Sequence, residues 1–323
     1  MPIVERKAPK NNLNKIDLLF SNEILKIIPE PKINIFKFML LNQHLYFGNA
    51  SKKQLNIFLQ GYYSLSFAQT IKLLIKGRIK YLKEGVVITD LWTRGYFHWL
   101  LDSLPRLILV DKPEITILLP IELKNFEFIE SSLRLLGFHK LYFMNQHEYK
   151  FIKKLNFPLQ LGPTGNYNEE VVKEVRKRYL NGFKNNERNR NIYISRSKAS
   201  RRKIANEELI IPLLLSYGIE IIHCEDLSFL EQVELFSETK LLISNHGAGL
   251  SNMLFLEGNS RVIEIRLQDD SLNNCYFSLA SALDIDYYYF EAESMNSSLK
   301  DAHLNDIYLD SLKFKSFLDE FFQ

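Results

Sequence analysis

The sequence has few of the residues that build metal centres, disulfide scaffolds or membrane spans. Its 323 residues include two cysteines, Cys224 and Cys275, whose spacing fits neither a zinc site nor a disulfide framework. No window reaches about 18 uninterrupted apolar residues, and the first residues lack the apolar core of a signal peptide. We therefore expect a cytoplasmic protein without structural zinc.

A strong charge of one sign is also missing. The 41 Lys and Arg residues nearly balance the 38 Asp and Glu residues, so the formal net charge is only +3. This mild excess argues against a surface that coats nucleic acid and favours local basic patches. One such patch, the basic and aromatic stretch 72–83, fits either a solvated face or a peripheral contact with an anionic membrane.

What is present is an ordinary globular composition and a regular second half. Hydrophobic residues make up 46% and charged residues 24%, and the length suits one large or two medium domains. Strands are expected at 191–195, 219–224, 240–243 and 262–265, and helices at 206–217 and 228–238. Ser228 and Glu231 have capping-box spacing, and Gly218 follows its helix as a stop signal. The alternation predicts a parallel sheet covered by helices on both faces.

The first half of the chain is less regular. Short apolar runs at 86–88, 115–119 and 141–144, with a helical stretch at 123–136, indicate a second α/β domain. The segment 158–168 holds two prolines and two glycines and is the best linker candidate. We predict an N-terminal domain over 1–160, a C-terminal domain over 161–303 and a final helix in 304–323 that packs back on the N-terminal domain.

The segment 244–252, Ser-Asn-His-Gly-Ala-Gly-Leu-Ser-Asn, ends an apolar run in small residues before a new helix pattern begins. Glycines let the backbone approach a ligand closely, and exposed amides at a helix start attract anions, so the turn suits a phosphate. His246 would supply a donor or a proton. The bland alternative is a turn that merely closes a tight connection between a strand and a helix.

Charged residues near other strand ends strengthen the anion interpretation. Arg196 follows an expected strand, Arg201 and Arg202 come next, and Glu264 lies near the end of a later apolar run. Ligands of parallel sheets bind at the carboxyl ends of the strands. A cationic arm, a glycine turn and a late glutamate together suit a nucleotide.

The stretch 95–107 places His98 and Asp102 four residues apart, and therefore on one face of a helix. Such a pair could orient an imidazole or hold a base near an acceptor hydroxyl. The alternative is a local hydrogen bond inside a buried turn, with Pro105 bending the helix.

These stretches together resemble glycosyltransferase family 61, whose members carry a His-Trp-x-x-Asp-x-Leu-Pro-Arg element, an Arg-containing strand, a His-Gly-Ala-Gly-Leu-x-Asn element and a glutamate. Here the elements are 98–106, 192–202, 246–252 and Glu264. The resemblance implies a GT-B fold, an α/β arrangement of two Rossmann-like domains facing across a cleft, the second of which holds a nucleotide sugar. It also implies an inverting, metal-independent sugar transfer that uses the nucleotide sugar as a substrate and needs no cofactor.

With that resemblance, Asp102 is the preferred base and His98 its orienting partner or the base itself, while Arg106 either steers the acceptor or pairs with Asp102. On the donor side, Arg196 with Arg201 or Arg202 would contact the diphosphate, aided by the backbone amides of Gly247, Ala248, Gly249 and Leu250. His246 would donate to a phosphate or sugar hydroxyl, and Glu264 would accept from the ribose hydroxyls. Asn252 would cap the helix or contact the ligand.

The expected function is transfer from a nucleotide-sugar donor to a hydroxyl of a bacterial surface glycan, in capsule, lipopolysaccharide or exopolysaccharide assembly at the inner face of the inner membrane. The composition, rich in lysine, asparagine and isoleucine, favours the bacterial setting. The alternatives are a nucleotide-sugar epimerase or hydrolase and, without enzymatic activity, a nucleic-acid binder using the basic run 195–203. Asp284 and Asp286 have the spacing of a metal-binding Asp-x-Asp element, but we interpret them as a strand edge or surface turn.

Overall fold

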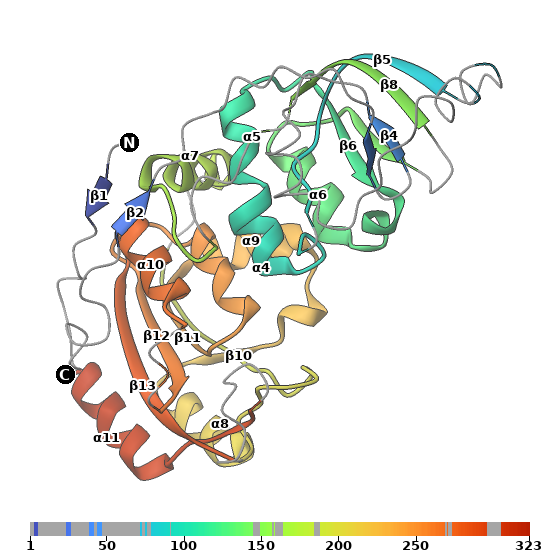
Figure 1. Cartoon of the computed structure of the whole chain (residues 1–323). Helices are drawn as coiled ribbons and strands as arrows, with labels where there is room; N and C mark the ends of the chain where they lie inside the picture. Colours follow the sequence, from blue (N-terminus) through green and yellow to red (C-terminus); the bar gives the residue numbers. More distant parts are fainter. Residues whose placement is uncertain are drawn as a thin grey trace. The chain divides into compact units, whose positions relative to one another are not determined.

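The computed structural model describes residues 79–90, 92–144, 149–156, 158, 164–183, 188–268, 270, 273–295 and 305–323, with Lys72, Ile75 and four short strands nearer the N-terminus (Figure 1). These strands form two antiparallel pairs, β1 (Ile3–Glu5) with β2 (Ile24–Lys26) and β3 (Met39–Leu41) with β4 (His44–Tyr46). Much of the basic stretch 72–83 and of the predicted linker 158–168 lies outside the described residues.

Contacts divide the chain into two compact units. Unit 1 comprises residues 27–161 with Met1, and unit 2 comprises residues 162–323 with residues 2–26. Each unit contains a parallel sheet and helices, which confirms the predicted α/β class.

The parallel sheet described in unit 1 has four strands in the order β7-β6-β5-β8. The strands are β5 (Ile79–Val86), β6 (Thr116–Pro120), β7 (Leu141–Met144) and β8 (Tyr149–Asn156). Strand β6 pairs with one side of β5, and β7 lies beyond β6. The next strand, β8, pairs with the other side of β5, so the strand order reverses between β5 and β8. In such sheets the ligand site lies outside the carboxyl ends of the strands at this reversal. The predicted run 86–88 begins at the end of β5 and continues as buried loop.

The helices that the structure describes in unit 1 beyond β5 begin in the loop after that strand. They are α4 (Tyr96–His98), the π-helical turn η1 (Trp99–Ser103), α5 (Pro105–Val110), η2 (Ile121–Asn125) and α6 (Glu127–Leu135). Pro105 has no N–H to continue the regular bonding, and the amide of Leu104 reaches back five residues to Trp99 O at 2.9 Å. Trp99 is fully buried and donates its indole N–H to Ser132 Oγ of α6 at 2.7 Å. The wide turn is thereby fixed against α6.

Unit 2 contains a sheet of the order β10-β9-β11-β12-β13-β14, in which the first five strands are parallel and β14 is antiparallel. The strands are β9 (Arg190–Ile194), β10 (Glu220–Ile222), β11 (Thr239–Asn245), β12 (Arg261–Leu267), β13 (Asp286–Ser294) and β14 (Ile307–Tyr308). The predicted parallel sheet is confirmed. The strand order reverses between β9 and β11, which places the expected ligand position at the carboxyl ends of these two strands.

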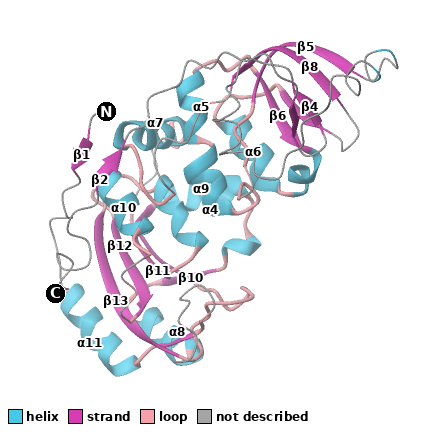
Figure 2. Ribbon diagram, viewed as in Figure 1, coloured by secondary structure: helices cyan, strands magenta, loops and turns pink. Residues whose placement is uncertain are grey.

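Helices cover both faces of this sheet (Figures 1 and 2). They are α7 (Glu169–Leu180), α8 (Glu207–Ser216), η3 (Cys224–Asp226), α9 (Phe229–Ser237), η4 (Ala248–Phe255), α10 (Cys275–Ala282) and α11 (Ser311–Phe321). Helices α8 and α11 share a core with one face of β11 and β12. A second group, formed by Tyr179, Phe229 and Phe255, joins α7, α9 and η4 through edge-to-face contacts. The capping box of Ser228 and Glu231 at the start of α9 is confirmed.

The C-terminal helix contributes to the core of unit 2. Its apolar face lies within unit 2, where Phe314 and Leu318 are fully buried and Phe321 meets Tyr288 edge to face at 4.9 Å. The buried face of this helix thus belongs to the core of unit 2, and packing of the helix on the N-terminal domain stays a prediction. Helical spacing shows that one face must be buried but does not identify the partner, and here β13 and α8 supply the apolar surface.

Candidate functional site

The glycine turn and the arginine loop meet at the strand reversal of unit 2. Arg196 comes two residues after β9 ends, and His246 directly follows β11. Gly247 has an extended backbone that any residue could adopt, but a side chain there would collide with Arg196: an added Cβ would lie 2.3 Å from Arg196 Nη1. Glycine is therefore needed at this position for the close approach of a guanidinium group.

The arginine loop carries three positive charges, and the carboxylate of Glu225 acts on Arg196 only from beyond ion-pair distance. Arg196 donates to the carbonyl oxygens of Arg202 and Arg201, each at 3.2 Å, which are neutral acceptors. Within the described ranges, no carboxylate lies at ion-pair distance from Arg196, Arg201 or Arg202. Burial lowers the pKa of Arg196, and burial together with the charge of Arg196 lowers that of Arg202. Such a cluster is stabilised by binding an anion.

The start of η4 adds backbone donors to the same corner. The amide of Leu250 donates to Gly247 O at 2.9 Å and is therefore used inside the turn. The amides of Gly247, Ala248 and Gly249 have no hydrogen-bond acceptor in the described part of the chain. Unpaired amides at a helix start are the groups that hold phosphate oxygens. Three of the four predicted amides remain candidates, and Leu250 is removed from the set.

The end of the arginine loop is fixed by the segment that precedes α11. The amide of Lys203 donates to Asp306 Oδ1 at 2.8 Å, and the amide of Ile307 donates to Lys203 O at 2.9 Å. Ala205 N in turn donates to Ile307 O at 2.8 Å. A loop held in this way loses less conformational freedom when it binds a ligand.

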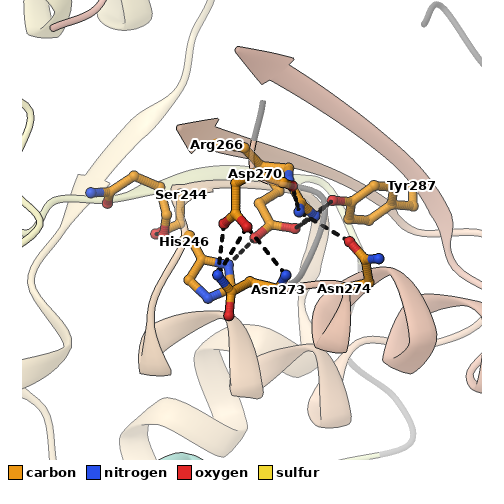
Figure 3. Close-up of polar contacts among 9 residues, drawn as sticks. Ser244, His246, Arg266, Asp270, Asn273, Asn274 and Tyr287 are labelled. Carbon is orange, nitrogen blue, oxygen red and sulfur yellow. Dashed lines mark hydrogen bonds and ion pairs between the residues drawn. The ribbon is translucent and has the colours of Figure 1, made fainter. Parts of the chain in front are cut away.

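Glu264 does not face a ligand. It is fully buried, it accepts a hydrogen bond from His246 Nδ1 at 2.5 Å and another from the Tyr287 hydroxyl, and Arg266 Nη1 lies 3.6 Å from its second oxygen. Figure 3 shows the side chains of His246, Arg266 and Tyr287 directed toward one another. The predicted contact between Glu264 and a ribose is therefore corrected, because β12 runs on to Leu267 and leaves Glu264 in the middle of the strand. Its role in the structure is to orient His246.

The charges around Glu264 are balanced inside the protein. Burial raises the pKa of Glu264, but the charges of Arg266 and His246 outweigh burial, and the pKa falls below its ordinary value. The fully buried Arg266 also donates to Asp270 O at 2.6 Å and to Asn274 Oδ1 at 3.1 Å. Asp270 is held by the Asn273 side chain at 2.8 Å (Figure 3). The network thus links β12 and β13 to the start of α10.

Replacing Glu264 by alanine is expected to lower the free energy of unfolding by about 3–5 kcal/mol, because Arg266 is left as an uncompensated buried charge. Chemical denaturation measures this loss. The carboxylate contributes stability above its unfolded pKa of about 4.3, and this contribution is lost as the pH falls further, because the folded pKa is depressed. Glu264→Gln should lack that acid-dependent part. The control Glu291→Ala removes an exposed carboxylate of β13 and should cost less than about 0.5 kcal/mol; equal losses would contradict the prediction.

In unit 1, His98 and Asp102 form the expected pair. His98 Nδ1 lies 2.8 Å from Asp102 Oδ2, and the side chains are 27% and 6% exposed. With the Nδ1 proton donated to the carboxylate, Nε2 is left as an acceptor. The more exposed imidazole is therefore the member of the pair that can take a proton from a bound hydroxyl.

Arg106 is fully buried and cannot steer an acceptor. It donates Nε to Asp102 O at 2.9 Å, Nη1 to Ile88 O at 3.1 Å and Nη2 to Asp90 Oδ2 at 2.7 Å. The prediction that Arg106 steers the acceptor is corrected by its burial: Arg106 forms an ion pair with Asp90 and holds the loop after β5 against η1. We did not predict Asp90. Its position in the loop after β5, three residues before Thr93, was the available signal.

Asn252 also points into the fold. It is fully buried and donates to Gln232 Oε1 of α9 at 3.1 Å, so the predicted cap or ligand contact is corrected to a packing contact between η4 and α9. The loop after β9 and the residue that follows β10 form a contact that we did not predict. Ser197 Oγ lies 2.9 Å from His223 Nε2.

The Asp284 and Asp286 pair lies away from the donor corner. Asp286 begins β13 and so lies at the amino ends of the parallel strands, whereas the arginine loop lies at their carboxyl ends. Asp284 is an exposed turn residue that pairs with Lys173. The described residues contain no group of three or more His, Cys, Asp and Glu arranged to hold a metal ion. Among the helices that the structure describes, none has the length and apolar character required to cross a membrane.

A Rossmann-like sheet with cationic side chains and unpaired amides at its strand reversal defines an α/β protein equipped to bind an anionic ligand. The chain belongs to glycosyltransferase family 61, since the sequence model of Glycosyltransferase 61 matches residues 96–263, more than half of its length. It is similar to the EGF domain-specific O-linked N-acetylglucosamine transferase of Drosophila melanogaster, with 31% identity over 105 residues, which are 32% of this chain and 20% of the fly protein. The match thus spans about a fifth of that relative's length.

Proposed function

We propose that the protein is an inverting, metal-independent glycosyltransferase that moves a sugar from a nucleotide-activated donor to a hydroxyl of a bacterial surface glycan. The observation that carries the donor half is the arginine cluster of Arg196, Arg201 and Arg202, which has no carboxylate at ion-pair distance in the described part of the chain. A nucleoside diphosphate supplies the missing negative charge, and the amides of Gly247 to Gly249 add donors.

The chemistry assigned to unit 2 is leaving-group stabilisation. As the bond between the anomeric carbon and the diphosphate oxygen breaks, its electron pair moves to the diphosphate, where Arg196 and the turn amides stabilise the developing charge. His246, oriented by the buried Glu264, would hydrogen bond to a phosphate or sugar hydroxyl. Neither role requires a metal ion.

The chemistry assigned to unit 1 is acceptor activation. The acceptor oxygen forms the new bond to the anomeric carbon while its proton passes to Nε2 of His98, and Asp102 stabilises the imidazolium that results. This assignment makes Asp102 the positioning partner and reverses the preference drawn from sequence. Transfer requires the reacting atoms to come within about 3.5 Å, so we propose that the two units face one another across the bound substrates, as in GT-B enzymes.

The setting follows from composition rather than from the relative. The name of the fly protein makes N-acetylglucosamine the first donor sugar to test here. The lysine-, asparagine- and isoleucine-rich sequence favours a bacterial protein at the inner face of the inner membrane, acting on a capsule, lipopolysaccharide or exopolysaccharide precursor.

Nucleotide release from a panel of nucleotide sugars tests the proposal, with and without EDTA and with glycans extracted from the source cells. We expect release that the glycans stimulate and that EDTA leaves unchanged, because arginines and amides take the place of a carboxylate-bound cation. Loss of release in EDTA would contradict metal independence. Release without any acceptor would instead indicate an epimerase or hydrolase.

A further inference from the structure

The two tryptophans of the chain have opposite environments. Trp99 is fully buried, whereas Trp92 is 68% exposed. A single exposed apolar side chain is ordinary on a protein surface, so exposure alone assigns no role. The position of Trp92 does indicate a role. The residue lies in the loop after the carboxyl end of β5, at the strand reversal of unit 1, where ligands of such sheets bind.

Trp92 lies beside the imidazole assigned as base. The centroids of the Trp92 and His98 rings are 5.7 Å apart, with 35° between their planes. Phe97 meets the same imidazole edge to face at 5.0 Å. An indole face open to solvent therefore adjoins the exposed member of the His98–Asp102 pair.

The loop holds Trp92 in a defined place. Its amide donates to Asp90 Oδ1 at 2.9 Å, and its carbonyl accepts from Gly95 N at 2.9 Å. The other oxygen of Asp90 accepts from the buried Arg106 at 2.7 Å, and Arg106 also holds Asp102 O. One buried guanidinium thus positions both the loop of Trp92 and the helix of His98. A site held in this way loses little conformational entropy when it binds a ligand, because its loop is already ordered.

We infer that Trp92 is the platform on which a sugar ring of the acceptor stacks, with a hydroxyl of that ring directed at Nε2 of His98. The inference rests on the proposed function and narrows it: the acceptor is a glycan, whose ring presents an apolar C–H face to the indole. A serine or threonine side chain has no such face. An amphipathic aromatic ring next to a polar reactive group is suited to this substrate, since it packs apolar surface and leaves the hydroxyls free.

A binding measurement tests the platform without requiring turnover. Acrylamide quenches the emission of exposed tryptophan, so quenching in this protein reports Trp92 because Trp99 is buried. Methyl glycosides of glucose, galactose, mannose and N-acetylglucosamine serve as probes. At least one of them is expected to protect the wild type and to give no protection in Trp92→Phe, whose remaining emission comes from Trp99.

A kinetic measurement completes the test with the acceptor glycans of the transfer assay. Trp92→Ala is expected to raise the acceptor KM about tenfold, equivalent to about 1.4 kcal/mol, with a smaller rise in Trp92→Phe and an unchanged Kd for the nucleotide. The control Tyr308→Ala removes an exposed aromatic side chain of unit 2 and should leave the acceptor KM unchanged. Glycan-dependent transfer with an unchanged KM in Trp92→Ala would overturn the platform and leave the proposed function standing. Protection by methyl glycosides without any transfer would support the platform and contradict the proposed function. Failure of every glycoside to protect an active enzyme would overturn the platform.

Discussion

Replacing His98 by alanine is expected to lower kcat by about two to four orders of magnitude, because the acceptor hydroxyl loses the base that takes its proton. The affinity for the nucleotide should be unchanged, since the base and the arginine loop belong to different units. Imidazole added to the solution should restore part of the activity by occupying the vacated volume beside Asp102. Initial rates at saturating donor measure the loss of kcat and its partial recovery with imidazole.

Asp102→Asn separates the two possible bases. If His98 is the base, the amide disturbs the orientation and charge of the imidazole and lowers kcat, and added imidazole does not restore activity. His139→Ala is the matched control, as it removes an exposed histidine of the same unit. Near-normal turnover of His98→Ala, combined with loss of activity in Asp102→Asn, would contradict this assignment and identify Asp102 as the base.

Replacing Arg196 by alanine is expected to weaken nucleoside diphosphate binding by about two orders of magnitude, because a half-buried charge-assisted contact with the diphosphate is lost. Arg196→Lys should recover only part of the affinity, since an ammonium group cannot reproduce the planar fork of donors. Isothermal titration calorimetry with the diphosphate measures Kd directly. Lys198→Ala, which removes an exposed cation of the same loop that already pairs with Asp226, should change Kd little.

Gly247→Ala tests the contact between Arg196 and the diphosphate by displacing the guanidinium group. The added methyl group would occupy the position of Arg196 Nη1, and the end of a flexible side chain can move away at little cost to the fold. We therefore expect weaker nucleotide binding with a nearly unchanged free energy of unfolding. Gly258→Ala is the control, because an added Cβ there meets nothing closer than Asp284 O at 4.0 Å. Unchanged nucleotide affinity in both Arg196→Ala and Gly247→Ala would overturn the assignment of the diphosphate.

The alternation of unit 2 could be predicted because each element carries a local signal. Strand runs of β-branched and aliphatic residues, the Ser228 capping box and the stop at Gly218 together fix where elements begin and end. The pairing of His98 with Asp102 followed from helical spacing in the same way, although the turn between them is a π-helix. Local patterns therefore gave the elements and one short-range contact.

The misassigned residues were those whose environment depends on distant chain. The expected strand at 262–265 ends next to Glu264, but β12 continues to Leu267, and only packing against β13 shows that this carboxylate faces Arg266 and Tyr287. Arg106 lies one turn from Asp102, yet its charge is balanced by Asp90, which lies sixteen residues away. Sequence spacing identifies residues that carry charge, whereas burial decides whether they meet a substrate or hold the fold.

The tie between Lys203 and the Asp306–Ile307 segment has a consequence for how the protein is made. The arginine loop follows β9, but its anchor lies 103 residues later in the chain. At a ribosomal rate of about 5–20 residues per second, the loop waits roughly 5–20 s for the segment that secures it. The corner assigned to the nucleotide is thus among the last parts of unit 2 to take its final form, and a nucleotide present during translation would meet an incomplete site.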